Sequence, residues 1–162
     1  MLSQTVEYAL RAVVCLAGAP EGRLTTPQIA AETQVPPGYL SKLLQALGRA
    51  GVVASQRGLG GGFTLGRPAE ELSVLDVVNA VDPLRRIAAC PLGKREHQLH
   101  LCPLHRRLDA AIASVEAAFA ATTIAEIIAE NRPGDAFPEF GGEREPCPGR
   151  DSNPHSLATT GS

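Results

Sequence analysis

The chain has 162 residues and a mass of 17.0 kDa, with 44% hydrophobic residues, 20% charged residues and a formal net charge of −2. This length predicts one compact domain with appendages. Two Tyr, four Phe and no Trp argue against a protein that stacks single-stranded bases on aromatic rings. The longest apolar run, at 12–19, is far shorter than the roughly 20 residues that span a bilayer, and it lacks a basic leader. We therefore expect a cytoplasmic protein whose four cysteines are reduced thiols or ligands.

The near-neutral net charge hides an asymmetry along the chain. Residues 1–67 carry six basic and three acidic side chains, whereas the remainder carries nine basic and fourteen acidic ones. No Asp or Glu occurs between Glu32 and Glu70, a stretch that holds four Arg or Lys. Because carboxylates repel a phosphate backbone, a long acid-free stretch favours a surface that faces nucleic acid. A surface that is short of acids by chance is the alternative.

The first third of the chain predicts three helices. Apolar residues at helical spacing indicate a helix over 3–17, and Thr26 as cap with Pro27 at the first helical position starts a helix that ends near Thr33. A diproline turn then precedes a third helix at 38–50. This third helix has an apolar stripe on one side and polar or basic residues on the other: Leu40, Leu43, Leu44 and Leu47 against Ser41, Lys42, Gln45 and Arg49. Two helices joined by a short turn, the second with a basic outer face, predict a helix-turn-helix.

A β-hairpin is predicted after the third helix. Two short β-prone runs, 52–57 and 63–65, flank a glycine-rich turn, and Arg57 and Arg67 lie at the two ends of the hairpin. Glycines at the tip let backbone N–H groups approach phosphates closely. A nucleotide-binding P-loop is excluded, because no Lys-Ser/Thr pair opens a helix after these glycines. The pattern predicts the wing of a winged helix-turn-helix.

The second half of the chain predicts a dimerisation unit. Ser73 has the capping pattern that opens a helix at 74–80, and the segment 84–101 has no clear period and is predicted to be a loop. Cys102-Pro103 starts a long helix to about Ala121, with the apolar stripe Leu104, Leu108, Ala111, Ile112, Val115 and Phe119. This stripe is too large to bury against a small winged domain, so we expect a homodimer that reads a two-fold, palindromic operator.

The end of the chain predicts one more helix and a tail. Thr123 with Glu126 caps a last helix that ends near Asn131, and the Pro- and Gly-rich sequence that follows predicts disorder. The organisation we predict is a DNA-binding domain at 1–83 and a sensor loop at 84–101. The dimerisation helix and the C-terminal helix follow at 102–131, and a disordered tail at 132–162.

One string of residues carries a family resemblance. Ala50-Gly51-Val52-Val53, Arg57-Gly58, Gly61-Gly62 and Leu65, followed by cysteines at the start of a long helix, resemble the Rrf-type (IscR/NsrR-like) family of winged helix-turn-helix transcriptional regulators. The resemblance extends from the first predicted helix to the last. It implies a mostly α fold with a β-hairpin wing and a long C-terminal dimerisation helix. It also implies a homodimeric DNA-binding regulator without enzymatic activity, in many members a repressor controlled by an iron–sulfur cluster.

We predict that the third helix enters the major groove of double-stranded DNA. Ser41, Lys42 and Gln45 are the candidates for base edges, whereas Arg49 and Arg57 are expected to hold phosphates. Tyr39, on the flank of the helix, contacts DNA or packs. The further predicted DNA-binding residues are at the wing tip and in the first turns of the two helices: Gly60, Gly61, Thr26 and Gly38.

The candidate sensor residues follow from the resemblance. Cluster-binding members carry three cysteines in this loop, sometimes followed by a His, and an acidic residue of the first helix can reach across from the partner. The matching positions here are Cys90, Cys102, His105 and Glu7, but Glu96 stands where the middle cysteine would be. A [2Fe–2S] cluster needs four protein ligands. Beyond Cys90, Cys102 and His105, the fourth would be Glu7 of the partner subunit, Glu96, His97 or His100.

Other interpretations of these cysteines stay open. Cys90 and Cys102 can form a dithiol switch, since a helix N-terminus and nearby basic residues favour the Cys102 thiolate. A zinc site and a loop that senses nothing are further alternatives, although the Cys spacing is not that of a zinc ribbon. Cys15 is expected to pack as a small hydrophobe, and Cys147 in the tail has little support as a ligand.

Two functions of other classes fit the sequence less well. An enzyme would use Cys102 as nucleophile and His105 as base, but no third group orients them. A winged module that binds only proteins is disfavoured by the acid-free stretch.

Overall fold

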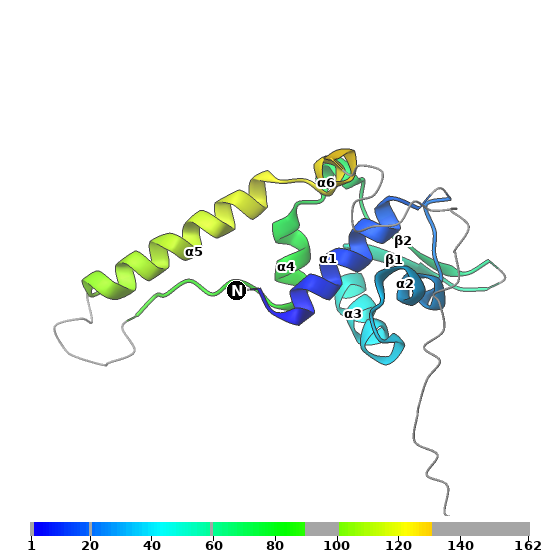
Figure 1. The fold of residues 1–162 in the computed structure, drawn as a ribbon, viewed down its shortest axis with the longest axis horizontal. Helices are drawn as coiled ribbons and strands as arrows, with labels where there is room; N and C mark the ends of the chain where they lie inside the picture. The colour runs from blue at the N-terminus through cyan, green and yellow to red at the C-terminus, as the bar shows by residue number, and fades with distance from the viewer. Residues whose placement is uncertain (1, 20, 59, 90–100, 131–162) are drawn as a thin grey trace, which may run out of the picture.

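The computed structural model describes residues 2–19, 21–58, 60–89 and 101–130. Its elements are, in chain order, α1 (Gln4–Ala17), α2 (Thr26–Thr33), α3 (Pro37–Arg49), β1 (Val53–Gln56), β2 (Gly62–Leu65), the 3₁₀ helix η1 (Ala69–Glu71), α4 (Val74–Val81), α5 (Pro103–Ala121) and α6 (Ile124–Glu130). α1 to α4 and the hairpin form a winged head, from which α5 projects, while α6 lies against the head (Figure 1). The expected fold class is confirmed. The expectations for Cys90, Glu96, His97, His100, Cys147 and the tail fall outside the described residues.

α1 is the central helix of the core. Ser3 caps it, since its hydroxyl accepts the Val6 N–H at 3.4 Å. Residues 12–16 are all buried, and the helix packs against α2, α3, α4 and α6. Burial raises the pKa of the Cys15 thiol to about 12, and Glu32 adds to the effect. Cys15 is therefore the inert, buried residue that the sequence predicted.

The cap of α2 is Thr25, which corrects the prediction of Thr26. Gln28 Oε1 accepts hydrogen bonds from the backbone N–H and the hydroxyl of Thr25, each at 2.8 Å. Thr26 and Pro27 then occupy the first turn of the helix. The Thr-x-x-Gln spacing of residues 25–28 is that of a capping box, so the sequence did contain this signal.

α3 begins and ends one residue before its predicted bounds. The four leucines of its apolar stripe are at most 3% exposed, and each contributes about 1.5–3 kcal/mol by burial. Gln34, with φ 58°, occupies the left-handed conformation that ends α2 and turns the chain toward Pro36 and α3. The leucine stripe fixes the rotation of α3, so its polar face must point to solvent.

The wing is the two-stranded antiparallel sheet of β1 and β2. Its register pairs Val53 with Leu65 and Gln56 with Gly62. The turn between α1 and α2 adds one further bridge: the Leu24 N–H donates to the Phe63 carbonyl at 3.0 Å, and the Phe63 N–H donates to the Leu24 carbonyl at 2.8 Å. The wing is therefore tied to the head along its second strand.

α6 completes the core of the head. The Ile124 N–H donates to the Leu72 carbonyl at 2.8 Å, and the Val74 N–H donates to the Thr122 carbonyl at 2.9 Å. Ile124 is fully buried in the core cluster that also contains α1. The predicted capping boxes of Ser73 in α4 and of Thr123 in α6 are both present.

α5 has two distinct sides. Ile112 and Phe119 are half-buried, and Phe119 packs against the cluster of Val6, Val74 and Val78. The rest of the predicted apolar stripe turns away: Leu104, Leu108 and Val115 are 63%, 47% and 42% exposed, and Ala111 is exposed as well. No residue of α5 is buried.

Candidate functional site

The outer face of α3 carries the polar and basic residues that we predicted from the sequence to contact DNA. Ser41, Lys42, Gln45 and Arg49 are all exposed. Within the described part of the chain, the side chains of Lys42, Gln45 and Arg49 have no hydrogen-bond or ion-pair partner. The Ser41 hydroxyl donates to the Pro37 carbonyl one turn back, at 3.1 Å. Among the described residues, three of the four side chains are thus free to bind a ligand. Ser41 has to break its hydrogen bond to the Pro37 carbonyl before its hydroxyl can donate to a ligand.

Tyr39 packs against α1. Its ring meets that of Tyr8 edge to face at 5.6 Å between centroids, and its hydroxyl is hydrogen-bonded to the Thr5 hydroxyl. Tyr39 is still 39% exposed. These contacts tie the first turn of α3 to the first turn of α1, so Tyr39 holds the orientation of α3 against the head.

The first turns of α2 and α3 have backbone N–H groups that are candidates for binding phosphate. Thr26 is half-buried, whereas Gly38 is exposed, and a Cβ atom at Gly38 would meet nothing within 4 Å. No atom of the described residues would clash with a side chain there, so the space beside Gly38 is open. The unpaired N–H groups of a helix's first turn favour anions.

The wing supplies one free arginine. Arg57 is exposed and has no ion-pair partner among the described residues. Arg67 lies 3.5 Å from the Asp76 carboxylate, so this acid of α4 pairs with it. A Cβ atom at Gly61 would lie 2.7 Å from the Gln56 carbonyl oxygen, which explains why the tip needs glycine. Gly60, with φ 80°, needs glycine for its conformation.

Arg23 is a basic residue of this surface that the sequence reasoning did not assign. It lies in the α1–α2 turn, and its guanidinium donates to the Gly60 carbonyl at the tip of the wing. It is 37 residues from Gly60 in sequence, so no local pattern marks the contact.

Cys102 and His105 form a pair at the start of α5. Cys102 is the cap residue of the helix, and its Sγ lies 3.1 Å from His105 Nδ1. Hydrogen bonds from the His105 backbone and side chain outweigh the opposing effect of burial and lower the pKa of Cys102 to about 7. The predicted one-turn juxtaposition is present, and Cys102 is a thiolate for a large fraction of the time at neutral pH.

Cys102 and His105 are residue types that bind soft metal ions. A thiolate and an imidazole on one side of a helix turn suit an iron–sulfur cluster or another thiophilic metal. Glu7 forms an ion pair with Arg11 on α1. Among the described residues, no three His, Cys, Asp or Glu side chains gather as a metal site. Within one protomer, Glu7 does not join Cys102 and His105.

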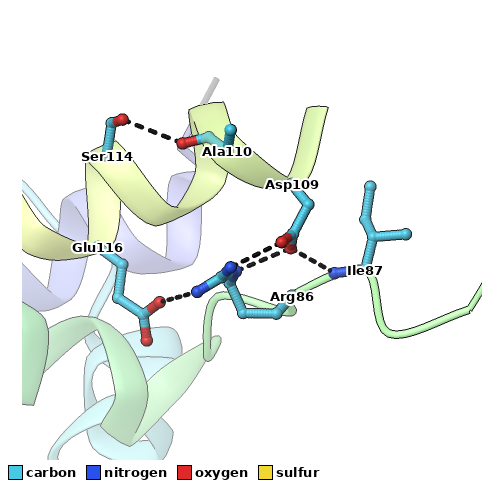
Figure 2. A network of polar contacts seen from close by, with 6 residues as sticks. All are labelled: Arg86, Ile87, Asp109, Ala110, Ser114 and Glu116. Atoms are coloured by element: carbon cyan, nitrogen blue, oxygen red, sulfur yellow. Dashed lines mark hydrogen bonds and ion pairs between the residues drawn. The ribbon is translucent and has the colours of Figure 1, made fainter. Parts of the chain in front are cut away.

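A network of polar contacts clamps the segment after α4 onto α5 (Figure 2). Arg86 Nε and Nη2 donate to the two carboxylate oxygens of Asp109 at 2.7 and 2.6 Å, and the Ile87 N–H donates to Asp109 at 2.9 Å. Glu116 lies 3.5 Å from Arg86. The hydrogen bonds from Arg86 and Ile87 lower the pKa of Asp109 to about 2. The segment after α4 is thereby fixed to α5 two turns after Cys102.

The fold and the exposed face of α3 define a class of protein. A helix-turn-helix whose second helix presents free polar and cationic side chains, beside a hairpin with a glycine-rich tip, is a winged helix-turn-helix. In the described residues, none of the helices is long and apolar enough to cross a membrane.

Comparison with known proteins gives the family. The family model Rrf2, described as an iron-dependent transcriptional regulator, matches residues 2–130, and the chain belongs to this family. A structure of CymR, the global cysteine regulator of B. subtilis, superposes with a TM-score of 0.67 at 23% identity, covering 82% of this chain and 98% of CymR. T. potens IscR gives 0.66 at 22%, covering 83% and 93%. An oxidized form of Staphylococcus aureus CymR gives 0.64 at 24%, covering 82% and 99%. These structures share the fold.

Family membership settles the general function. The chain is an Rrf2-family transcriptional regulator with a DNA-binding winged helix, and it is not an enzyme.

Proposed function

We propose that the protein is a cytoplasmic, homodimeric repressor that binds a palindromic operator, with DNA affinity controlled by an iron–sulfur cluster or by the redox state of Cys90 and Cys102. The observation that carries the DNA-binding part is the outer face of α3, where cationic and polar side chains are exposed and unpaired among the described residues. The iron-dependent description of the family supports the control by iron.

α3 enters the major groove in this proposal. Lys42 and Gln45 read base edges, and Ser41 joins them when its bond to the Pro37 carbonyl is exchanged. Arg49 binds a phosphate. The backbone N–H groups of Thr26 and Gly38, in the first turns of α2 and α3, bind phosphates of the DNA backbone.

The wing lies along the backbone or the minor groove. Arg57 binds a phosphate, and the tip at Gly60 and Gly61 brings backbone N–H groups close to it. Tyr39 acts through its packing on α1, which holds α3 in its binding orientation.

Lys42 offers the direct test. Lys42→Met removes one cation from the exposed face of α3 without touching the leucine stripe, so operator affinity should fall about 5- to 100-fold, as for loss of one specific contact. Arg85→Met is the matched control. Arg85 is exposed in the segment after α4, so this substitution removes one positive charge at a place outside α3 and the wing. Fluorescence anisotropy with operator DNA selected from genomic fragments measures both. Equal affinity of Lys42→Met and wild type would remove Lys42 from the interface.

The outward side of α5 supports the homodimer. Leu104, Leu108 and Val115 lie close together on the helix and point away from the head. A two-fold axis along this side would bury the stripe of one protomer against that of its partner and place two α3 helices for a two-fold operator.

Cys102 supports control by the sensor region. In the cluster form, Cys90, Cys102 and His105 would hold a [2Fe–2S] cluster, with Glu7 of the partner subunit as a further ligand. A mixed Cys and His ligand set raises the reduction potential of such a cluster, which suits a redox sensor.

A dithiol switch is the second candidate, favoured by the lowered pKa of Cys102. In this form the Cys90 and Cys102 thiols are oxidised to a disulfide while hydrogen peroxide is reduced to water. The structure of an oxidized CymR shows that a protein of this fold has been isolated in an oxidised state.

The clamp gives a route from the sensor to the DNA. Arg86 and Asp109 join the two chain segments that flank the sensor loop, so a change in the loop acts on the angle between α5 and the head. A coupling of about 1–3 kcal/mol between sensor and operator is enough for regulation.

Anaerobic purification separates the two forms of control. The cluster form predicts bound iron and acid-labile sulfide that are lost in Cys102→Ser. The dithiol form predicts an iron-free protein whose operator affinity changes with peroxide and is restored by a dithiol reductant. Iron-free protein with peroxide-independent affinity would contradict both.

A further inference from the structure

Arg23 lies against the tip of the wing although it belongs to the turn between α1 and α2. The Leu24–Phe63 bridge fixes the backbone of this turn along β2. From there the Arg23 side chain follows the wing, since a Cβ atom at Gly62 would lie 3.2 Å from Arg23 Cγ and one at Gly60 would lie 3.5 Å from Nη1. The guanidinium ends at the Gly60 carbonyl and donates to it.

The Arg23 guanidinium keeps most of its hydrogen-bonding capacity. A guanidinium has five N–H donors in a planar fork, and the bond to Gly60 uses only part of them. Arg23 is exposed, and within the described ranges it forms no ion pair, Glu21 of the same turn included. Its positive charge is therefore not neutralised at the tip of the wing.

The surroundings suit a phosphate. Gly60 and Gly61 carry no side chain that would keep a ligand away from the backbone of the wing tip, and Arg57 leads into the same turn. An arginine fork binds phosphate oxygens in a bidentate manner, and a fork already held at one edge loses less freedom when it binds.

We propose that Arg23 is an additional DNA-binding residue that holds the tip of the wing through the Gly60 carbonyl and binds a backbone phosphate with its remaining donors. The inference rests on the proposed function, in which the wing lies along the DNA. It extends the DNA-binding surface from the hairpin to the α1–α2 turn.

The salt dependence of binding distinguishes a phosphate contact from a structural role. Each phosphate contact contributes about 0.9 to the slope of log affinity against log salt on B-DNA. Arg23→Met keeps an unbranched side chain over Gly62 and removes the charge. For a dimer we expect the slope to fall by about 1.8, so the loss of affinity between 50 and 200 mM salt becomes about twelvefold smaller. The probe is a mixed-sequence duplex of about 30 base pairs, because non-specific binding is carried by phosphate contacts.

Two further variants complete the test. Arg23→Lys keeps the charge but loses the fork, so it should keep the wild-type slope with a lower affinity. Arg85→Met removes one charge away from the wing and should leave the slope unchanged. Thermal unfolding followed by circular dichroism verifies that each variant is folded.

The outcomes separate this inference from the proposed function. A wild-type slope in Arg23→Met overturns the phosphate contact, whether or not its affinity falls, and so does an equal fall in Arg85→Met. Failure of the folded wild-type protein to bind the duplex at low salt would instead refute the proposed placement of the wing and α3 on DNA.

Discussion

Replacing Leu104 and Leu108 together with alanine tests the role of α5 in assembly. Both side chains lie on the outward side of the helix, and neither belongs to the core of the head. If this side pairs with a second copy, the double substitution should dissociate the dimer and leave the fold of the protomer intact.

The size of the effect follows from the exposed fractions. Leu→Ala removes three carbon groups, worth about 0.8 kcal/mol each when fully buried. Leu104 and Leu108 expose 63% and 47% of their surface in the single chain. Burial of those fractions corresponds to about 1.5 and 1.1 kcal/mol, and the two copies of each residue give about 5 kcal/mol per dimer. The dimer dissociation constant should therefore rise about 5,000-fold.

Sedimentation equilibrium over a range of protein concentrations measures this constant. Ala117→Ser is the matched control, because Ala117 is exposed on α5 and lies about half a turn round the helix from Leu108. The unfolding midpoint of the monomeric variant in urea verifies the fold. A dissociation constant within tenfold of the wild-type value in the folded double variant would refute the pairing through this side of α5.

Three further predictions concern α4 and the start of α5. Ser73→Ala removes the acceptor of the Asp76 N–H bond at 3.1 Å and should lower the free energy of unfolding by about 1 kcal/mol, measured by denaturant titration. Burial raises the pKa of Asp76, but hydrogen bonds from Ser73 and the nearby Arg67 outweigh it, so the pKa is lowered from 3.8. The stabilising contribution of the Asp76 carboxylate is therefore complete above pH 3.8, and it is lost as the pH falls through the lower pKa of the folded state. If the difference in free energy of unfolding between wild type and Asp76→Ala grew as the pH fell, this expectation would be wrong. In metal-free protein, the alkylation rate of Cys102 by iodoacetamide should be half-maximal near pH 7, and His105→Ala should move this midpoint toward 9.0. Mass spectrometry follows the rate, and a midpoint that does not respond to His105→Ala would show that the imidazole does not stabilise the thiolate.

The helices were predictable because their signals are local. The leucine stripe of α3 repeats at i, i+3 and i+4, so the same spacing that indicates a helix also identifies its outer face. The capping boxes of α4 and α6 lie within three residues. The prediction was wrong at the cap of α2, where Thr25 and Thr26 are both suitable cap residues. Thr25 is the cap because its backbone N–H donates to the Gln28 side chain.

Which arginines are free and which are paired was not predictable from local signals. In the sequence, Arg57 and Arg67 mark the two ends of the wing alike, yet Arg67 is paired with Asp76 of α4. Arg23 gives no sequence signal, and its place at the wing tip depends on the bridge between Leu24 and Phe63. The charge pattern of a sequence shows how many cationic side chains there are, but it does not show which of them form ion pairs with carboxylates in the folded protein.

The sequence by itself determined the helix-turn-helix, the wing and the long apolar helix, because short-range periodicity, capping and turn chemistry specify each of them. Only the tertiary structure decided that Tyr39 braces α3 against α1, that Arg86 joins Asp109, and that the stripe of α5 divides between the head and solvent. Those contacts join residues distant in sequence, and their geometry depends on how whole helices pack around one core, which no local pattern records.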